Sequence, residues 1–250
     1  MKICVFDTET TSLEKPFCYN VGFVLYDTEK QETLCEEEYC IEQIWHNLPL
    51  FSSAYYAEKR PIYVNRMRAK KILLEKWGYV TQRMARLFKQ YEIECAFAYN
   101  SSFDEQVFYF NCEWFKTINP FDNIPVLDIR AYVHQFIATT LDFRDWCEEN
   151  NAFTESGNYS TTAETLFRYT TGNVDFEEEH TALADSEIEL FILLETIEKG
   201  AVLGEKYATL RSIERIVPKT LTVKDKDGHQ HLFDYEKIRI NKDKTLIRLS

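Results

Sequence analysis

Glycine is scarce in this 250-residue chain, and none of its seven glycines belongs to a G-x-x-x-x-G-K-[ST] loop. A chain without that phosphate-cradling loop is a poor candidate for nucleoside triphosphate chemistry. The seven cysteines are odd in number and never form a C-x-x-C pair. Zinc sites and disulfide frameworks are therefore disfavoured, and we expect reduced, buried thiols.

Long apolar runs are also missing. No stretch approaches the ~20 apolar residues that a membrane-spanning helix needs. The first apolar run meets the acidic Asp7 too early to be a signal peptide. We therefore expect a soluble, cytoplasmic protein that has no membrane partner.

Charge is distributed unevenly along the chain. Lysine and arginine number 29 against 41 acidic residues, which gives a net charge of -12. Residues 1–200 hold 18 basic and 34 acidic side chains, whereas residues 201–250 hold 11 and 7. A basic segment, residues 59–89, carries ten basic residues and only one acid, Glu75. Such a segment is usually a solvated helix face, and the alternative is a surface that binds phosphates.

Hydrophobic periodicity predicts a mixed α/β protein. With 45% hydrophobic and 15% aromatic residues, the chain can bury a sizeable core. Strands are predicted at residues 2–7, 19–26, 32–41, 95–99 and 126–129, and helices at 64–91 with a break near Gly78, 103–116, 132–138, 142–150, 162–169 and 182–198. The first three strands form an antiparallel meander, the later ones are parallel, and helices flank this central sheet. We assign no separate role to the segment between the third strand and Cys95.

The last 50 residues are predicted to be a small β-rich appendage, so the proposed domains are 1–200 and 201–250. Strands at 220–223 and 231–233 flank Asp227-Gly228, a strong hairpin signal, and 245–249 adds a third strand. The free edge of this hairpin is able to pair with another chain, so the oligomeric state stays open.

Two carboxylates stand at the end of the first predicted strand. Asp7 and Glu9 are two residues apart, so they project from one face of an extended chain. Paired carboxylates repel each other unless a cation lies between them, and Mg²⁺ and Mn²⁺ prefer oxygen ligands. The pair is a candidate metal site, and an ordinary solvated strand end is the alternative.

Two further groups of polar residues stand at helix starts. Asp104 falls in the first turn after Asn100-Ser101-Ser102-Phe103, where acids are also favoured by the helix dipole alone. His180 precedes the predicted helix 182–198 and Asp185 lies inside it. A histidine close to carboxylates suits general-base catalysis, whereas a capping histidine and a solvated aspartate are the alternative.

Together, the segments FDTETT, YNSSFD and HTALADSE resemble the DnaQ-like (DEDD) family of 3′-to-5′ exonucleases, in the DEDDh subgroup. The resemblance covers about residues 1–200. It implies an RNase H-like fold in which four acids hold two Mg²⁺ or Mn²⁺ ions and a histidine is the general base. The acids are Asp7, Glu9, Asp104 and Asp185, and the base is His180. The implied reaction releases nucleoside 5′-monophosphates from a 3′ end.

The same resemblance suggests contacts to the terminal nucleotide from Thr10, Leu13 and Phe103, although core packing is an equal alternative for Leu13 and Phe103. Asn100 is expected to fix the strand-to-helix turn. The implied partner is nucleic acid with a single-stranded 3′ end, and DNA is preferred. The basic segment 59–89 or the basic tail would then guide the strand behind that end.

Two other readings remain open at this point. An RNA exonuclease would use the same fold and metals, because the 2′-hydroxyl is recognised by pocket detail rather than by a motif. A binding subunit attached to a polymerase or another replication partner would keep the fold with an idle site. Five intact catalytic positions argue against the second reading.

Overall fold

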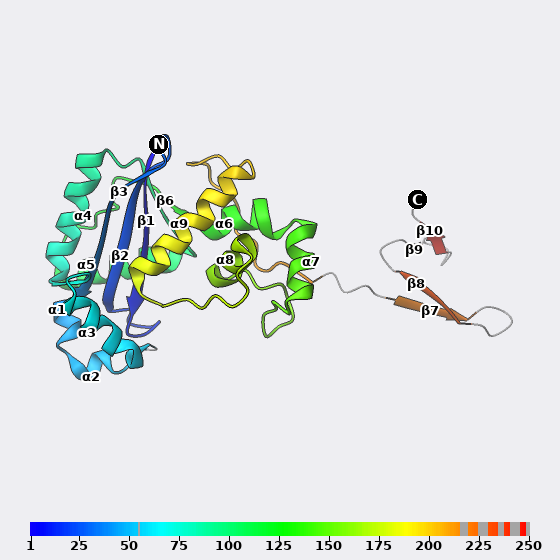
Figure 1. Cartoon of the computed structure of the whole chain (residues 1–250), viewed down its shortest axis with the longest axis horizontal. Coiled ribbons are helices and arrows are strands. Elements are labelled where there is room, and N and C mark those ends of the chain that lie inside the picture. Colours follow the sequence, from blue (N-terminus) through cyan, green and yellow to red (C-terminus); the bar gives the residue numbers. More distant parts are fainter. Residues whose placement is uncertain (55, 216–219, 225–229, 235–237, 241–245, 249–250) are drawn as a thin grey trace. The chain divides into compact units, whose positions relative to one another are not determined.

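In the computed structural model of the chain, the described residues are 1–54, 56–215, 220–224, 230–234, 238–240 and 246–248 (Figure 1). The chain divides into two compact units, Met1–Ile213 and Glu214–Ser250. This division lies thirteen residues beyond the predicted boundary at 200/201. Residues 201–213 belong to the first unit because Ala201 and Ile213 are buried in its core and the Tyr159 amide donates to the Ile213 carbonyl, 3.0 Å away.

A six-stranded sheet forms the centre of the first unit, in the order β4-β3-β2-β1-β5-β6. The strands are β1 (Lys2–Thr10), β2 (Cys18–Asp27), β3 (Glu32–Ile41), β4 (Leu73–Glu75), β5 (Cys95–Ala98) and β6 (Val126–Asp128). The β1–β2 and β2–β3 pairs are antiparallel, and the β1–β5, β5–β6 and β3–β4 pairs are parallel. The predicted meander within a mixed sheet is confirmed.

Helices cover both faces of this sheet, as Figure 1 shows for α4 and α9. They are α1 (Glu42–Trp45), α2 (Leu48–Phe51), η1 (Ala57–Lys59), α3 (Arg60–Arg68), α4 (Trp77–Tyr91), α5 (Ser101–Phe115), α6 (Ile129–Val133), the π-helix η2 (His134–Ala138), α7 (Leu141–Glu149), α8 (Ala163–Thr171) and α9 (Ala182–Glu198). Strand β1 alternates between two cores. Cys4 and Phe6 join the cluster beside α4 and α5, whereas Ile3 and Val5 join the cluster beside α9.

The predicted helix 64–91 is wrong in its middle. The chain breaks at residues 69–76, where β4 pairs in parallel with residues 39–41 of β3, and Gly78 lies inside α4. Lys70 adopts a positive φ of 57° just after α3, which ends the helical run. A three-residue edge strand draws its hydrogen bonds from a distant neighbour, so hydrophobic periodicity could not indicate it.

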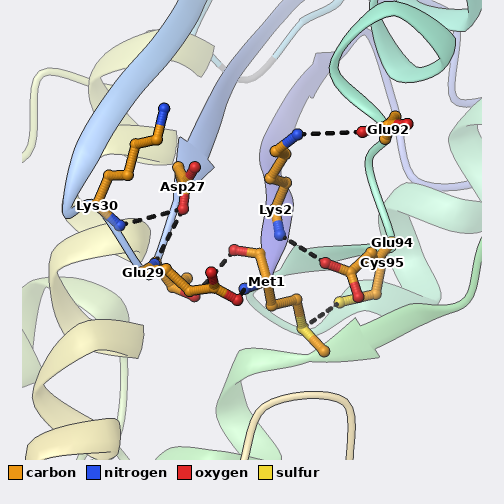
Figure 2. Close-up of polar contacts among 9 residues, drawn as sticks. Met1, Lys2, Asp27, Glu29, Lys30, Glu92, Glu94 and Cys95 are labelled. Carbon is orange, nitrogen blue, oxygen red and sulfur yellow. Dashed lines mark hydrogen bonds and ion pairs between the residues drawn. The ribbon is translucent and has the colours of Figure 1, made fainter.

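Polar contacts hold the beginning of β1 in its register (Figure 2). The Met1 amino group pairs with Glu29 Oε1 at 2.9 Å, on the turn between β2 and β3. The Lys2 amide donates to Glu94 Oε1 at 2.9 Å, just before β5. These contacts tie β1 to both of its neighbours, so its carboxylates emerge at a defined place at the opposite end.

The second unit contains two pairs of short antiparallel strands. Strand β7 (Thr220–Lys224) pairs with β8 (Gln230–Asp234), which confirms the predicted hairpin strands, whereas the predicted Asp227-Gly228 turn lies outside the described residues. Strand β10 (Leu246–Arg248) corresponds to the predicted third strand but pairs with β9 (Ile238–Ile240), which the sequence analysis missed. None of the helices in the described ranges combines the length and apolar content needed to cross a bilayer.

Candidate active site

All five predicted catalytic residues gather around the end of β1. Asp7 and Glu9 continue the β1 face that Ile3 and Val5 turn toward α9. The intervening Thr8 faces the other way, and its hydroxyl donates to Asp104 Oδ1 at 2.6 Å, in the first turn of α5. Three elements that are far apart in sequence thereby bring their acids to one place.

Two residues of β2 seat the first turn of α9 against the sheet. The Ala182 amide donates to Asn20 Oδ1 at 2.8 Å, and the Ser186 hydroxyl donates to the Gly22 carbonyl at 3.2 Å. Gly22 is the β-ladder partner of Asp7. The helix turn that carries Asp185 therefore lies beside the first of the two β1 acids.

The start of α5 is set by the turn after β5. Asn100 adopts a left-handed φ of 62°, which asparagine tolerates better than most residues. Its amide donates to Asp128 Oδ1 at 2.9 Å, at the end of β6. This turn directs α5 so that Asp104, 3% exposed, points back to β1.

Burial of these like charges raises their pKa values. Desolvation, opposed by an amide hydrogen bond, raises the pKa of Asp7 to about 7. Desolvation, together with the charges of Asp7 and Glu178, raises the pKa of Asp185 to about 10. The pKa values of Glu9 and Asp104 are also raised, mainly by burial. A cluster of this kind is unfavourable in its ionised form unless a cation neutralises it.

The donor set fits a hard divalent cation. Glu9, His180 and Asp185 each offer a ligand atom, and these atoms lie within 4.8 Å of one another. Asp185 Oδ1 is buried and has no hydrogen-bond partner among the residues that the structure describes. An uncompensated buried carboxylate oxygen beside other carboxylate oxygens matches the chemistry that Mg²⁺ and Mn²⁺ prefer.

His180 lies at the edge of the carboxylate cluster. Its ring stacks on Tyr56, with centroids 4.4 Å apart and an interplanar angle of 14°. Its Nδ1 is 3.7 Å from Glu178 Oε2. Burial and the positive charge of Lys59 lower the pKa of the imidazole. The ring is therefore neutral near neutral pH and able to accept a proton.

Two acids beside the site were not predicted from the sequence. Glu189 is 4% exposed, and its Oε2 accepts a hydrogen bond from the Tyr99 amide at 3.1 Å. Burial and the charges of nearby acids, Asp7 first among them, raise its pKa. Its i, i+4 spacing from Asp185 places both on one helix face and was the available signal. Glu178 faces His180, and burial raises its pKa to about 7.

The three residues expected to contact the nucleotide differ in environment. Thr10 is half-buried at the end of β1, and its hydroxyl donates to the Ser12 carbonyl at 3.4 Å. Leu13, on the loop that follows, is 79% exposed. Phe103 is half-buried and packs against the core cluster beside α4 and α5. The exposed Leu13 is free of the core, whereas Phe103 contributes to it.

The basic segment 59–89 does not act as one surface. Lys59 and Arg66 bond to residues 179–181, and Arg83 pairs with Glu37. Lys70 and Lys71 are exposed. The segment is therefore not one continuous solvated face, and phosphate binding stays a prediction for exposed residues such as Lys70 and Lys71.

A scan against protein-family models and a search of curated proteins find no match. Among solved structures, the chain is similar to the nuclease domain of 3′hExo, a DEDDh family member, bound to rAMP. The identity is 13%, the TM-score is 0.55, and the match covers 86% of this chain and 97% of that one. It is also similar to a full-length 3′-exonuclease, with 14% identity and a TM-score of 0.54 over 94% of this chain and 67% of that one. A third similar structure is described as 3′-end-specific recognition of histone mRNA stem-loop by 3′-exonuclease, with 12% identity and a TM-score of 0.53 over 94% of this chain and 91% of that one.

The chain therefore has the fold of the DEDDh 3′ exonucleases. This confirms the predicted RNase H-like α/β architecture and the resemblance on which it was based.

Proposed function

We propose that this chain, with its DEDDh-type fold, is a metal-dependent 3′-to-5′ exonuclease that hydrolyses terminal phosphodiesters and releases nucleoside 5′-monophosphates. The observation that carries the proposal is the convergence of four acids, of which Asp104 is buried and the other three are half-buried, and a histidine from β1, α5, the loop before α9 and α9 itself. A structural role alone does not explain it, because buried like charges destabilise a fold. We assign the activity to Met1–Ile213.

Two Mg²⁺ or Mn²⁺ ions would be held by Asp7, Glu9, Asp104 and Asp185. When bound, such ions stabilise the negative charge that develops on the attacking and leaving oxygens of an in-line phosphoryl displacement. Thr8 keeps Asp104 facing the β1 acids through its 2.6 Å hydrogen bond.

His180 is proposed as the general base. Its lowered pKa keeps the ring in the neutral form that takes a proton from the attacking water. Glu178 Oε2 lies 3.7 Å from Nδ1, so it favours the imidazolium that results. That leaves Nε2 as the nitrogen that accepts the proton.

The proposed substrate is a single-stranded 3′ end, with DNA preferred. Thr10 and the exposed Leu13 would contact the terminal nucleotide, and Phe103 would support the site from the core side. RNA is a second candidate, because one similar structure is bound to rAMP and another concerns a histone mRNA stem-loop.

We further propose that the protein acts in the cytoplasm, where the seven free thiols would persist. A polymerase or another replication protein is the proposed partner.

The test is release of mononucleotides from 3′-labelled single-stranded DNA and RNA of matched sequence, with Mg²⁺ or Mn²⁺. Asp7→Ala, Asp185→Asn and His180→Ala should each lower the rate by at least about 10²-fold. Asp145→Asn is the matched control, since Asp145 is exposed on α7. If the folded wild-type protein releases no nucleotide from either polymer, the idle binding subunit replaces this proposal.

A further inference from the structure

Three consecutive residues at the general-base loop are each held from the α3 side. One hydrogen bond reaches each of them: from Lys59 Nζ to the Glu179 carbonyl (2.9 Å), from the Tyr63 hydroxyl to the His180 carbonyl (3.1 Å), and from Arg66 Nη1 to Thr181 Oγ1 (2.9 Å). We call Lys59, Tyr63 and Arg66 the α3 clamp. Its members are separated from the loop by more than 110 residues of sequence, so only the fold brings them together.

The positions of the α3 clamp suit this task. Tyr63 and Arg66 are three residues apart and share one face of α3, and Lys59 immediately precedes the first turn of that helix. Arg66 also forms ion pairs with Glu179 and with Glu38, a buried acid of β3. The clamp is thereby connected to the sheet as well as to the loop.

Tyr63 is the most constrained member. It is fully buried, and its ring packs edge-on against Tyr19 and Trp45, with centroids 5.8 and 6.0 Å away. The Tyr19 hydroxyl in turn donates to Glu9 Oε2 at 3.3 Å. The same aromatic layer therefore contacts a β1 acid and the backbone of the histidine.

His180 needs such support because of its backbone. Its φ is 53°, in the left-handed region that non-glycine residues rarely adopt. A residue in that region keeps its conformation only when its surroundings hold it there. The Tyr63 bond to the carbonyl and the Tyr56 stack on the ring hold the backbone and the side chain separately.

We infer that the α3 clamp, and Tyr63 above all, positions His180 for proton transfer. Tyr63 is a positioning residue because its hydroxyl reaches the His180 carbonyl and acts on the imidazole only through the backbone. The inference rests on the exonuclease function proposed above. It also gives a role to the segment between β3 and β5, to which the sequence analysis assigned none.

The first test removes one hydroxyl. Tyr63→Phe should lower kcat by about tenfold with KM unchanged, because one hydrogen bond to the loop is lost and the ring packing is kept. In a His180→Ala background, the same substitution should cause no further loss. A matched control is Tyr132→Phe: Tyr132 is equally buried, and its hydroxyl donates to the Glu205 carbonyl at 2.6 Å in the other core.

Two outcomes of that test would overturn the inference. One is a kcat for Tyr63→Phe that stays at the wild-type or Tyr132→Phe value. The other is a loss that persists undiminished in the His180→Ala background, since Tyr63 would then act independently of the histidine.

A second readout does not depend on activity. The Hε1 signal of His180 in the metal-free protein senses the Tyr56 ring, so Tyr63→Phe should shift it while Tyr132→Phe leaves it in place. An unmoved signal overturns the positioning role. If the signal shifts but the protein cleaves neither polymer, Tyr63 still holds the histidine loop, and only the proposed exonuclease function is rejected.

Discussion

Gly22 on β2 lies directly against the backbone of Leu183 in α9: a Cβ atom placed on Gly22 would come within 2.1 Å of the Leu183 nitrogen. No side chain can occupy that space without moving the helix, because the obstructing atoms belong to the main chain. The contact permits the Ser186 hydroxyl to reach the Gly22 carbonyl and brings Asp185 beside Asp7. A missing side chain on one element thus sets where the acid of another element lies.

Gly22→Ala should displace the first turn of α9 and destabilise the fold by about 2–4 kcal/mol, since overpacking against backbone cannot be relieved by a rotamer change. The free energy of unfolding from urea denaturation measures this. Gly78→Ala is the comparison, because the added Cβ there meets only the side-chain methyl of Thr117, at 3.0 Å. Equal stability of the two variants would contradict the close β2–α9 contact.

Stability of the metal-free protein should fall as pH rises. Asp7 and Asp185 have folded-state pKa values raised to about 7 and about 10, so they keep protons that the unfolded chain has already released. Their contribution to the free energy of unfolding is complete below their ordinary pKa of 3.8 and is lost as the pH rises through the raised pKa values. A divalent cation replaces those protons, so added Mg²⁺ should raise Tm more at about pH 8.5 than at about pH 6.

The variant Asp185→Asn separates this effect from general salt effects. It should be more stable than wild type at about pH 8.5 without metal, and Mg²⁺ should raise its Tm less. Asp145→Asn, exposed on α7, should behave as wild type. A Tm increase with Mg²⁺ that is the same at both pH values would argue against metal binding by these carboxylates.

His134 should destabilise the fold in mild acid. It is fully buried, Nδ1 accepts the Leu210 amide at 3.1 Å, and Nε2 lies 3.2 Å from Thr161 Oγ1, so the ring is neutral. Burial and the Arg130 charge lower its pKa to about 4, against the opposing effect of Asp128. Between its ordinary pKa of 6.5 and about 4 the unfolded chain gains a proton that the folded chain does not, which costs up to about 3 kcal/mol.

Urea unfolding of wild type and His134→Gln from about pH 8 to about pH 4.5 checks this. Other groups titrate in both proteins, so the difference between the two isolates this ring. The stability of the variant relative to wild type should rise as the pH falls below 6.5. A difference that does not change with pH would show that folding leaves the pKa of His134 unshifted.

The exposed pair Lys70 and Lys71 remains the best part of the basic segment for guiding a strand. Changing both to Glu should weaken binding to a single-stranded oligonucleotide and reduce the salt dependence of log K by at least about 1.4, from two lost phosphate contacts. Lys30→Glu is the control, since Lys30 lies on the turn between β2 and β3, beside the start of β1 (Figure 2), whereas Asp7 and Glu9 lie toward the other end of that strand. If the salt dependence of binding is unchanged in the double variant, Lys70 and Lys71 do not guide the strand.

Much of the site could be predicted from the sequence, because the patterns that indicate it lie within short segments of the chain. Asp7 and Glu9 share a face because a strand repeats every two residues, and α9 spans residues 182–198 as its apolar pattern predicted. Asp104 lies in the first turn of α5 and Asp185 lies inside α9, as expected. Family resemblance joined these separate signals into one predicted site, and the comparison with solved structures confirms the fold that it implied.

What the tertiary structure alone decided is how distant segments meet. Strand β4 exists through its ladder with β3, Glu189 is buried where it accepts the Tyr99 amide, and Tyr63 reaches His180 from 117 positions away. A short window of sequence indicates that Glu189 and Asp185 share a helix face, but it indicates neither the burial of Glu189 nor the two distant contacts. The sequence by itself determined which faces carry carboxylates, because periodicity is a property of adjacent residues. The packing of α9 on Gly22 and of α3 on the histidine loop required the folded chain, because van der Waals contact and hydrogen-bond geometry depend on distance in space.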